Sequence, residues 1–308
     1  MGQKSCEKFP IEPILKEYFD SWSPIFPVDA GLVNCVYTFE AGEEKYVLRV
    51  YAPTAYIERS KDSLLAELDV MALFGSTGVP VQEPIPNRSG ELVTAGQGYF
   101  AIVFQYIEGT HAYGALLPVH FREMGGLMAD MHRAAIELRP ACEKKWDGKD
   151  FWEYVWGLGD LERDDLGELL LASKKDKEIL ETANHYCIHG DFHFGNVLFK
   201  GNTLAALLDF DNYRLGDAAD DIARFFVAEL SYAEPNVYSQ SQGKIQAFFE
   251  EYQIHRPMDP AEVQLLFAYL RLHELYQTIR LGHEKPEKLP YFHEQMHDLW
   301  EWVKEICH

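Results

Sequence analysis

The sequence predicts an α+β protein of two lobes: a small β-rich N-terminal lobe with one main helix, and a larger, mostly helical C-terminal lobe. Three observations support this prediction. Strand-like runs dominate the chain up to about residue 106, helix-period segments dominate after Gly109, and 308 residues suffice for roughly two lobes. We therefore expect the lobes to comprise residues 1–106 and 107–308, joined by a short connector near Ile107.

The N-terminal lobe begins with strand signals. Val36–Phe39 and Tyr46–Tyr51 are rich in β-formers, and the turn Ala41–Glu44 between them predicts a hairpin. Ser60–Gly75 repeats its apolar residues at helical spacing before the glycine ends the pattern. Tyr99–Phe104 is an uninterrupted apolar run typical of a buried strand. Together these segments predict a small sheet with one helix.

The C-terminal lobe is predicted to be mainly helical. Amphipathic spacing recurs in five segments, which are His120–Ile136, Trp152–Leu171, Asp220–Tyr232, Lys244–Tyr252 and Pro260–Leu281. The helical pattern is interrupted by two apolar runs, 197–199 and 204–208, on either side of Gly201-Asn202. This dipeptide is a hairpin signal, so a second hairpin is expected within the helical lobe.

Composition excludes several classes of partner. The chain has 49 acidic and 28 basic residues, a formal charge of -21, so it is not suited to a nucleic-acid backbone. The longest apolar stretch, Tyr99–Ile107, is too short to cross a bilayer, and the N-terminal decapeptide has no apolar signal core. Five scattered cysteines without a Cys-x-x-Cys pair indicate reduced thiols. We expect a cytoplasmic protein without membrane or nucleic-acid partners.

Polar residues gather at the open end of the second hairpin. Asp191 and Asn196 precede its first strand, and Asp209 and Asp211 follow its second. Carboxylates held by buried strands are costly unless a cation neutralises them. Oxygen ligands of this kind suit magnesium, so the hairpin predicts a metal site.

The spacing within this cluster indicates a reaction type. Asp191 and Asn196 form D-x-x-x-x-N, and His189 stands two residues before the aspartate. The kinase catalytic loop has this spacing; its Asp accepts the proton of the substrate hydroxyl and its Asn holds magnesium. Asp209, thirteen residues after Asn196, stands where a second metal-binding carboxylate is needed. These positions predict phosphoryl transfer.

The run HGDFHFGNVLF, followed by LLDFDNYRLGDAADDIARF, resembles the aminoglycoside phosphotransferase and choline kinase family. Three blocks match in order: H-G-D-x-x-x-x-N, I/L-D, and G-D-x-x-x-D-[IL]-A. The resemblance covers nearly the whole chain and implies a two-lobed, protein-kinase-like fold that uses ATP and Mg²⁺. It assigns Asp191 as catalytic base, Asn196 and Asp209 as magnesium ligands, and Asp221 as a structural support of the loop.

Two further blocks resemble the nucleotide site of this family. Arg49 occupies the strand position where many kinases have a phosphate-contacting lysine, and Glu67 on the following helix resembles its ion-pair partner. Arginine suits phosphate, but its planar fork is not interchangeable with an ammonium. The segment after strand 99–104 is similar to a kinase hinge, which implies that backbone groups around Gln105 and Ile107 pair with adenine.

The chain departs from protein kinases in two places. Residues 31–36 lack the G-x-G-x-x-G loop, and Asp209-Phe210-Asp211 replaces D-F-G with no A-P-E after it. These departures favour a small molecule over a protein as the phosphate acceptor. A Ser/Thr protein kinase of the same fold, and a nucleotide-binding pseudokinase without turnover, remain alternatives.

Several residues have a second interpretation. His189 and His193 flank Asp191 as H-x-D-x-H, which also fits a zinc hydrolase; we expect instead that His189 braces the loop and that His193 lies near the substrate. Asp211 is expected either to bind metal or to be a solvated turn residue. His132, in an apolar helix, is expected to be buried and hydrogen-bonded.

The expected reaction moves the γ-phosphate of ATP to a hydroxyl of a small molecule. The acidic balance of the chain favours an acceptor with an amine, such as an aminoglycoside, an amino alcohol or a hydroxy-amino acid. Glu274, on the predicted helix 260–281, is a candidate contact for this acceptor.

Overall fold

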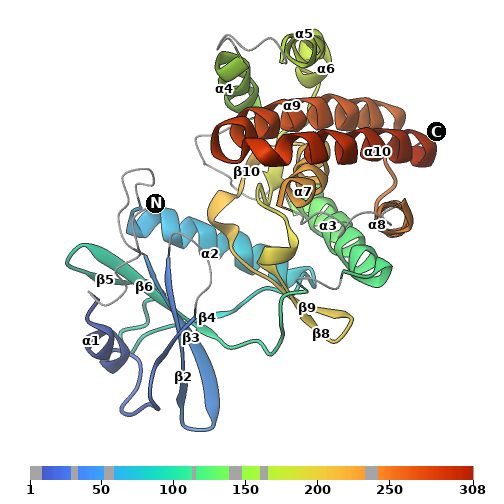
Figure 1. Cartoon of the computed structure of the whole chain (residues 1–308). Coiled ribbons are helices and arrows are strands. Elements are labelled where there is room, and N and C mark those ends of the chain that lie inside the picture. Colours follow the sequence, from blue (N-terminus) through green and yellow to red (C-terminus); the bar gives the residue numbers. More distant parts are fainter. Residues whose placement is uncertain are drawn as a thin grey trace. The chain divides into compact units, whose positions relative to one another are not determined.

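A computed structural model describes residues 9–28, 34–51, 59–112, 116–138, 148–159, 166–232 and 242–307 (Figure 1). The chain divides into two compact units, Met1–Gly75 with Pro80–Glu108, and Ser76–Val79 with Gly109–His308. The first unit contains an antiparallel sheet and the second is mostly helical. The predicted α+β class is confirmed.

The sheet of the first unit has the strand order β1-β2-β3-β6-β4, and β5 pairs with β6. All these pairings are antiparallel. The elements of the unit are α1 (Ile11–Lys16), β1 (Phe26–Val28), β2 (Cys35–Ala41), β3 (Glu44–Tyr51), α2 (Lys61–Ser76), β4 (Pro84–Ile85), β5 (Thr94–Gly96) and β6 (Tyr99–Gln105). The expected β2–β3 hairpin forms, and Gly42 in its turn has a φ of 66°.

One buried cluster of the first unit lies on one face of this sheet. Leu48 and Val50 of β3 alternate inward, and Ala101 and Val103 of β6 lie beside them in the same buried cluster. The helix α2 buries a stripe at helical spacing, Leu64, Leu68, Met71 and Phe74. The alternation in the strands and the 3.6-residue period in the helix therefore match the sequence pattern that predicted them.

The cysteines differ from the expectation at one position. Cys35 is disulfide-bonded, whereas Cys187 and Cys307 are free thiols. The expectation of reduced thiols was therefore wrong for Cys35. Disulfide formation depends on which cysteines the fold brings together, and scattered spacing in the sequence does not reveal this proximity.

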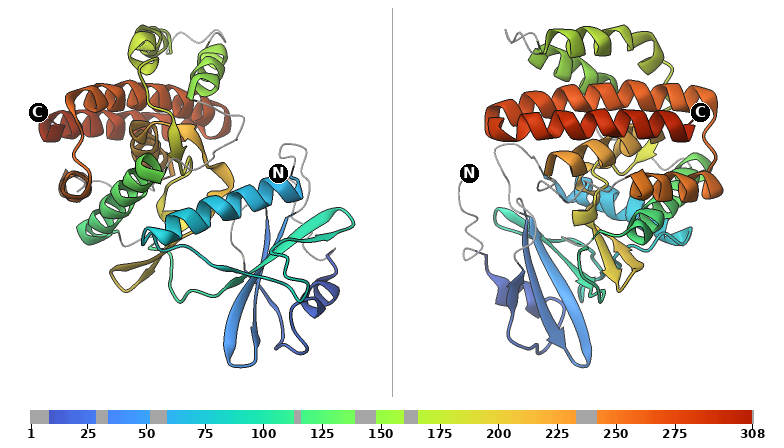
Figure 2. Two further views of the ribbon diagram at one scale, coloured as in Figure 1. Left: turned by 180° about the vertical axis from the view of Figure 1, so that it is seen from behind. Right: turned by 45° about the vertical axis from the view of Figure 1, so that its right-hand side comes forward.

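The helices of the second unit are α3 (Pro118–Leu138), α4 (Gly148–Gly159), α5 (Gly167–Lys175), α6 (Lys177–Leu180), α7 (Ala218–Tyr232), α8 (Gln242–His255), α9 (Pro260–Glu284) and α10 (Leu289–Cys307). The long helices α9 and α10 run side by side (Figure 2), and α7 and the α4–α6 group each pack against α9. The expected helix 152–171 falls on α4 and α5, and its residues 160–165 lie outside the described residues. The helix α10 was not predicted. No helix in the described residues is long and apolar enough to span a membrane.

Two short two-stranded sheets hold the loops that carry Asp191, Asn196, Asp209 and Asp211. β7 (Tyr186–Ile188) pairs with β10 (Arg214–Gly216), and β8 (Val197–Lys200) pairs with β9 (Thr203–Leu207). The predicted turn at Gly201 forms with a φ of 65°. Residues 189–196 therefore connect β7 to β8, and residues 208–213 connect β9 to β10. Buried strands anchor both loops at each end.

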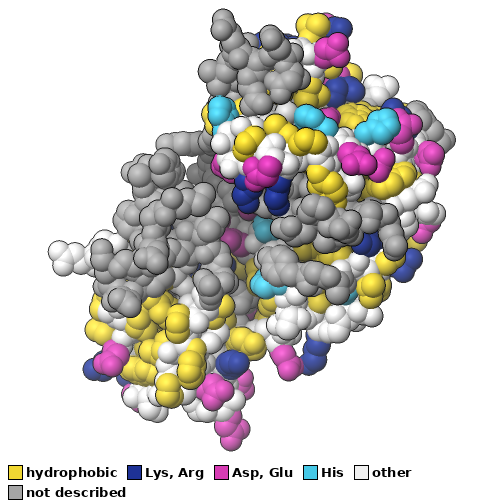
Figure 3. Space-filling view, viewed as in Figure 1, with side chains coloured by type: hydrophobic (Ala, Val, Ile, Leu, Met, Phe, Trp, Pro, Cys, Tyr) yellow, Lys and Arg dark blue, Asp and Glu magenta, His cyan; other side chains and the backbone are white. Residues whose placement is uncertain are grey.

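Charged side chains on the described part of the face in Figure 3 are mixed. Lys and Arg occur there in small groups between acidic and apolar side chains, not as one broad basic surface. This distribution agrees with the excess of acidic residues in the composition.

Candidate active site

The loop 189–196 is fixed by its first two residues. The backbone N–H groups of His189 and Gly190 donate to the carboxylate of Asp221, at 2.9 and 2.8 Å. The His189 ring accepts from the Asp191 N–H at 3.3 Å and donates to the Leu208 carbonyl at 3.2 Å. Burial lowers the pKa of His189, which agrees with a neutral ring that has one donor and one acceptor nitrogen. His189 thus ties the loop to the segment after β9.

Gly190 is required by space and by backbone geometry. Its φ is 74°, and a Cβ there would lie 2.2 Å from the Asn212 carbonyl oxygen and 2.4 Å from a nitrogen of Arg214. The Arg214 guanidinium donates to the Gly190 carbonyl at 2.9 Å. The two loops therefore approach so closely that no side chain fits between them.

Asp220 is a buried carboxylate on α7. It accepts from Arg214 at 2.7 Å and from His273 of α9 at 2.7 Å. Burial alone would raise its pKa, but the Arg214 charge and the His273 hydrogen bond hold the pKa of Asp220 well below its ordinary value. The ionised carboxylate thus links β10, α7 and α9 beneath the loop.

Asp221, the next residue of α7, is also a buried carboxylate that links several segments. Besides the two loop N–H groups, it contacts His132 Nε2 at 3.3 Å, and His132 Nδ1 lies 2.9 Å from the Tyr252 hydroxyl. His132 is fully buried, as the sequence predicted. The carboxylate that the family resemblance names as structural therefore accepts hydrogen bonds from both the loop and α3.

The Asp191 carboxylate is surrounded by donors. Its Oδ1 accepts from Arg224 Nη2 at 2.7 Å, and its Oδ2 accepts from Asn212 Nδ2 at 3.3 Å. His193 Nε2 lies 3.8 Å from Oδ2, which is an ion-pair distance and not a hydrogen bond. Burial would raise the pKa of Asp191, but His193 and Arg224 together hold it well below its ordinary value. Asp191 is therefore an ionised carboxylate that is held by Arg224 and Asn212, with His193 beside it.

Asn196 and Asp209 stand at the ends of the two loops. Asn196 Nδ2 donates to the Asp191 carbonyl at 2.9 Å, so its amide oxygen is the atom left for a ligand. The Asn196 carbonyl accepts from Leu208 N at 2.7 Å, which brings it beside the residue before Asp209. Asp209 has a φ of 60°, and it is the one non-glycine residue with positive φ in the described chain. Such a conformation is rare and concentrates at functional sites.

These oxygen donors fit a magnesium ion that shares its coordination with phosphates. No group of three or more His, Cys, Asp or Glu side chains in the described residues is placed to hold a metal by itself. Magnesium commonly takes one or two protein oxygens and completes its shell with phosphates and water. The zinc interpretation lacks ligands, because both ring nitrogens of His189 and Nδ1 of His193 already have hydrogen-bond partners in the loops.

In the first unit, Arg49 lies on β3 opposite Ile102 of β6, and its guanidinium is 6.0 Å from the Phe104 ring centroid. Glu67 is buried on α2, only 3% exposed, and Arg59 Nη1 lies 3.8 Å from its carboxylate. A buried carboxylate requires a cation, and Arg59 supplies one. Glu67 is therefore not an exposed position of this helix.

The hinge-like segment shows which backbone donors are occupied. The Gln105 N–H donates to the Glu83 carbonyl at 2.9 Å, and the Tyr106 N–H donates to Lys45 at 3.0 Å. The Ile107 N–H has no hydrogen-bond partner in the described residues. Of the two predicted adenine contacts, only Ile107 therefore keeps a backbone donor for a ligand.

Three residues near these groups were missed by sequence reasoning: Arg224, Asn212 and Arg59. Arg224 lies three residues after Asp221 in Asp-Ile-Ala-Arg, so helical spacing could have placed both on one side of α7. Asn212 follows Asp211, which the sequence analysis named as a possible metal ligand. Asp211 is half-buried in a short 3₁₀ turn, Phe210–Asn212. Neither Asn212 nor Arg59 has a sequence pattern that would have revealed its partner.

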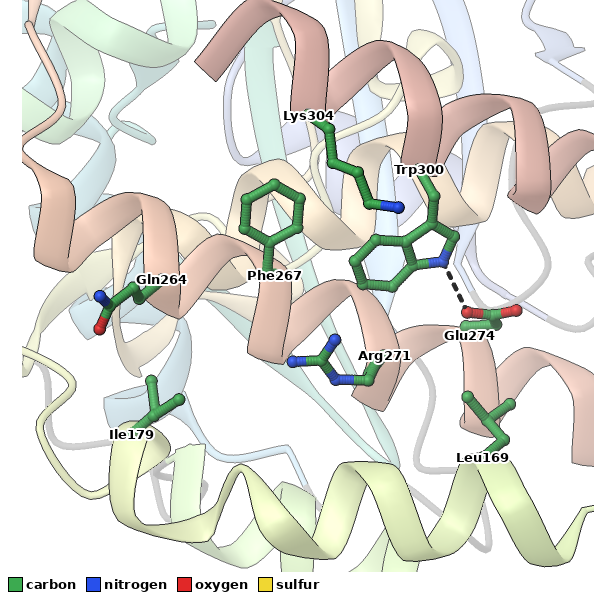
Figure 4. Close-up of a pocket in the computed structure, with 8 residues that line it drawn as sticks. All are labelled: Leu169, Ile179, Gln264, Phe267, Arg271, Glu274, Trp300 and Lys304. Atoms are coloured by element: carbon green, nitrogen blue, oxygen red, sulfur yellow. Dashed lines mark hydrogen bonds between the residues drawn. The ribbon is translucent and has the colours of Figure 1, made fainter. Parts of the chain in front are cut away.

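A pocket of about 600 Å³ lies elsewhere in the second unit (Figure 4). It is lined by Leu169, Ile179, Gln264, Phe267, Arg271, Glu274, Trp300 and Lys304. Trp300 Nε1 donates to Glu274 at 3.0 Å, and burial raises the pKa of Glu274. Arg271 pairs with Asp176 at 2.8 Å and lies 5.4 Å from the Trp300 ring centroid. The Arg271 guanidinium thus lies near the Trp300 ring. The pocket residues of α9 lie on a different face of that helix from His273.

Comparisons with known proteins identify the family of this chain. The sequence profile of the phosphotransferase enzyme family matches residues 25–260. A homoserine kinase of Agrobacterium fabrum is 26% identical over 249 residues, which cover 77% of this chain and 72% of that protein. A homoserine kinase of Parvibaculum lavamentivorans is 30% identical over 230 residues, which cover 70% of this chain and 68% of that protein.

Solved structures of low sequence identity share the fold. An amicoumacin kinase in complex with AMP-PNP, Ca²⁺ and Ami has a TM-score of 0.73 at 18% identity and covers 97% of this chain and 96% of its own. A microcompartment-associated aminopropanol kinase has a TM-score of 0.70 at 19% identity, with 93% and 94% covered. The predicted protein-kinase-like fold is thereby confirmed. The chain belongs to the phosphotransferase enzyme family, and it is a small-molecule kinase.

Proposed function

We propose that this enzyme transfers the γ-phosphate of ATP to the hydroxyl of a small, amine-bearing molecule, with a hydroxy-amino acid as the favoured acceptor. The observation that carries the proposal is the pair of interlocked loops that hold Asp191, Asn196 and Asp209. The relatives named homoserine kinase support a hydroxy-amino acid over an aminoglycoside, because they are similar to this chain in sequence over most of its length.

In the proposed reaction the acceptor oxygen forms a bond to the γ-phosphorus, and the bond from that phosphorus to the β–γ bridging oxygen breaks. ADP leaves with this electron pair. Asp191 orients the acceptor hydroxyl and takes up its proton, which then passes to solvent. His193, whose pKa is raised by Asp191 although burial opposes this, lies beside the base.

Asn196 and Asp209 are the proposed ligands of Mg²⁺, and Asp211 is an accessory candidate. The metal, when bound with ATP, neutralises phosphate charge. Within the chain, the Asn196 amide donates to the Asp191 carbonyl and is thereby oriented, and Asp209 has a left-handed backbone.

Residues 1–106 are the proposed nucleotide-binding lobe, and residues 107–308 the catalytic and acceptor-binding lobe. Arg49 is proposed to contact phosphate, Glu67 to fix the cations near it, and Ile107 to donate its N–H to adenine, with Gln105 beside it. The ATP requirement favours a cytoplasmic location.

The test is thermal unfolding with ATP, with and without Mg²⁺, followed by an acceptor screen that detects ADP release. At a hundredfold excess over its dissociation constant, a ligand of the folded state raises the free energy of unfolding by about 2.7 kcal/mol. We expect stabilisation that requires Mg²⁺, and ADP release with a hydroxy-amino acid. Absence of stabilisation by any nucleoside triphosphate would overturn the proposal, and binding without turnover of any acceptor would indicate a pseudokinase.

A further inference from the structure

The pocket of Figure 4 has an apolar wall made by four helices of the second unit. Leu169 and Ile179 line it from α5 and α6, Phe267 lines it from α9, and Trp300 lines it from α10. The Phe267 and Trp300 rings stack, with centroids 5.7 Å apart and planes 13° apart. The volume of about 600 Å³ is in the range of small-molecule sites. The pocket therefore has the size and the apolar surface to hold the hydrocarbon part of a small ligand.

Glu274 supplies an open carboxylate oxygen to this pocket. Its Oε2 accepts from Trp300 Nε1 at 3.0 Å. Its Oε1 accepts no hydrogen bond within the described part of the chain, and it is not sealed from solvent. Burial raises the pKa of Glu274, because the carboxylate charge is withdrawn from water. The indole thus fixes the carboxylate, and a cation at Oε1 would offset the cost of its charge.

The charged groups at the pocket leave an excess of negative charge. Arg271 faces Glu274, but its guanidinium binds both oxygens of Asp176, at 2.5 and 2.8 Å. Lys304 pairs with Glu301, one turn earlier on α10, at 2.8 Å. Three carboxylates therefore stand against two cations. The formal charge of -21 on the whole chain adds a long-range attraction for cations.

We propose that this pocket is a second ligand site, which binds the ammonium group of a small organic amine at Glu274 and its hydrocarbon part against Phe267 and Trp300. An ammonium has three donors, so it can donate to Oε1 and keep donors for water. The pocket is separate from the supports of the catalytic loop, because His273 contacts Asp220 from a different face of α9. Glu274 then binds this second ligand and not the phosphate acceptor. The inference goes beyond the proposed function and does not depend on it.

The test is calorimetric titration of the whole chain with 2-phenylethylamine, which has no hydroxyl to accept a phosphate. 2-Phenylethanol has nearly the same shape without the charge, and 3-phenylpropanoate carries a carboxylate in place of the ammonium. The amine should bind roughly tenfold or more tightly than either compound, because only the amine makes a charged hydrogen bond to Glu274. Absence of amine binding, or equal binding of the amine and the alcohol, would overturn the inference.

Glu274→Gln removes the charge but keeps an acceptor oxygen for Trp300 Nε1, so the fold should be preserved. Binding of 2-phenylethylamine should weaken by roughly 10- to 100-fold, as expected for loss of a charged hydrogen bond. Glu301→Gln is the matched control, because it removes a nearby carboxylate that does not line the pocket. It should change the affinity by less than about threefold, since exposed charges are screened. Equal losses in the two variants would show only general charge attraction, and the inference would fall.

Asp191→Asn distinguishes this pocket from the catalytic loop, where another half-buried carboxylate can attract an amine. This variant should bind 2-phenylethylamine with the affinity of wild type. Weaker binding in Asp191→Asn, together with wild-type affinity in Glu274→Gln, would place the amine at the catalytic loop and overturn the inference. None of these titrations requires turnover or a nucleotide. Failure of the proposed function is therefore detected separately, by thermal unfolding with ATP and Mg²⁺.

Discussion

Asp191 and Asp209 are both aspartates of the loops around the second hairpin, yet their surroundings differ. Asp191 accepts hydrogen bonds from Arg224 and Asn212 and stands beside His193. Asp209 has the left-handed backbone at the end of the other loop. The first carboxylate is held by side-chain donors, and the second belongs to a residue with a left-handed backbone. We therefore expect their substitutions to fail in different ways.

The first prediction contrasts Asp191→Asn with Asp209→Asn. Asparagine has nearly the shape of aspartate, and it tolerates the positive φ of Asp209. Both substitutions should therefore preserve the fold. Asp191→Asn should lower turnover by roughly 10²- to 10⁴-fold, the usual contribution of a general base, with little change in ATP affinity. Asp209→Asn removes a charge from the metal site and should also weaken nucleotide binding. A magnesium titration of nucleotide binding checks both; loss of metal-dependent binding in Asp191→Asn alone would show that the two roles are reversed.

At the scale of elements, the two-stranded sheets β7–β10 and β8–β9 bring the loops 189–196 and 208–213 into contact. Gly190 sits where the loops touch, and Gly201 sits in the solvent-exposed turn of the β8–β9 hairpin. Both have positive φ, 74° and 65°. Only at Gly190 would a side chain meet neighbouring backbone. A comparison of Gly190 with Gly201 therefore separates the cost of a positive φ from the cost of a close contact.

The second prediction uses this pair. Gly201→Ala should cost about 1 kcal/mol of unfolding free energy, the price of a left-handed conformation with a side chain. Gly190→Ala should cost clearly more, because the Asn212 carbonyl must also move, and it should impair catalysis by separating the loops. Chemical denaturation measures both. Equal losses of stability for the two variants would contradict the close contact.

Sequence patterns predicted the elements whose signals are local. The β2–β3 and β8–β9 hairpins were predicted because alternating or apolar runs flank glycine-containing turns, and α9 was predicted from its apolar spacing. Its start is fixed by the capping box between Asp259 and Glu262. The separate start of α5 at Gly167 was missed because apolar residues recur on both sides of it at helical spacing.

The candidate site could be predicted only in part. Asp191, Asn196 and Asp209 follow a fixed spacing, so the sequence alone brought them together as candidates. Arg224 contacts Asp191 across 33 residues, and Arg59 reaches Glu67 from another segment of the first unit. Such contacts depend on tertiary structure. The same reason explains the disulfide at Cys35, which no spacing indicated.

At the scale of the whole molecule, buried titratable groups in the second unit link stability to pH. His273 and His189 are completely buried, and burial lowers the pKa of each although neighbouring aspartates oppose this. In the unfolded chain a histidine has a pKa of about 6.5. Below this pH the unfolded state takes up protons that the folded state does not, so acid favours unfolding. His193 has the opposite shift, but its stabilising contribution is already complete below pH 6.5 and cannot offset the loss.

The third prediction follows from the lowered pKa values of these buried histidines. The free energy of unfolding should fall below pH 6.5, by up to about 1.4 kcal/mol per pH unit for each neutral buried histidine. His273→Gln keeps a donor for Asp220 but does not titrate, so its stability should fall less steeply between pH 6.5 and 5. His297→Gln, at an exposed position, should retain the wild-type slope. Denaturant unfolding across this range measures the slopes, and identical slopes for wild type and His273→Gln would show that His273 takes up its proton equally in the folded and unfolded states.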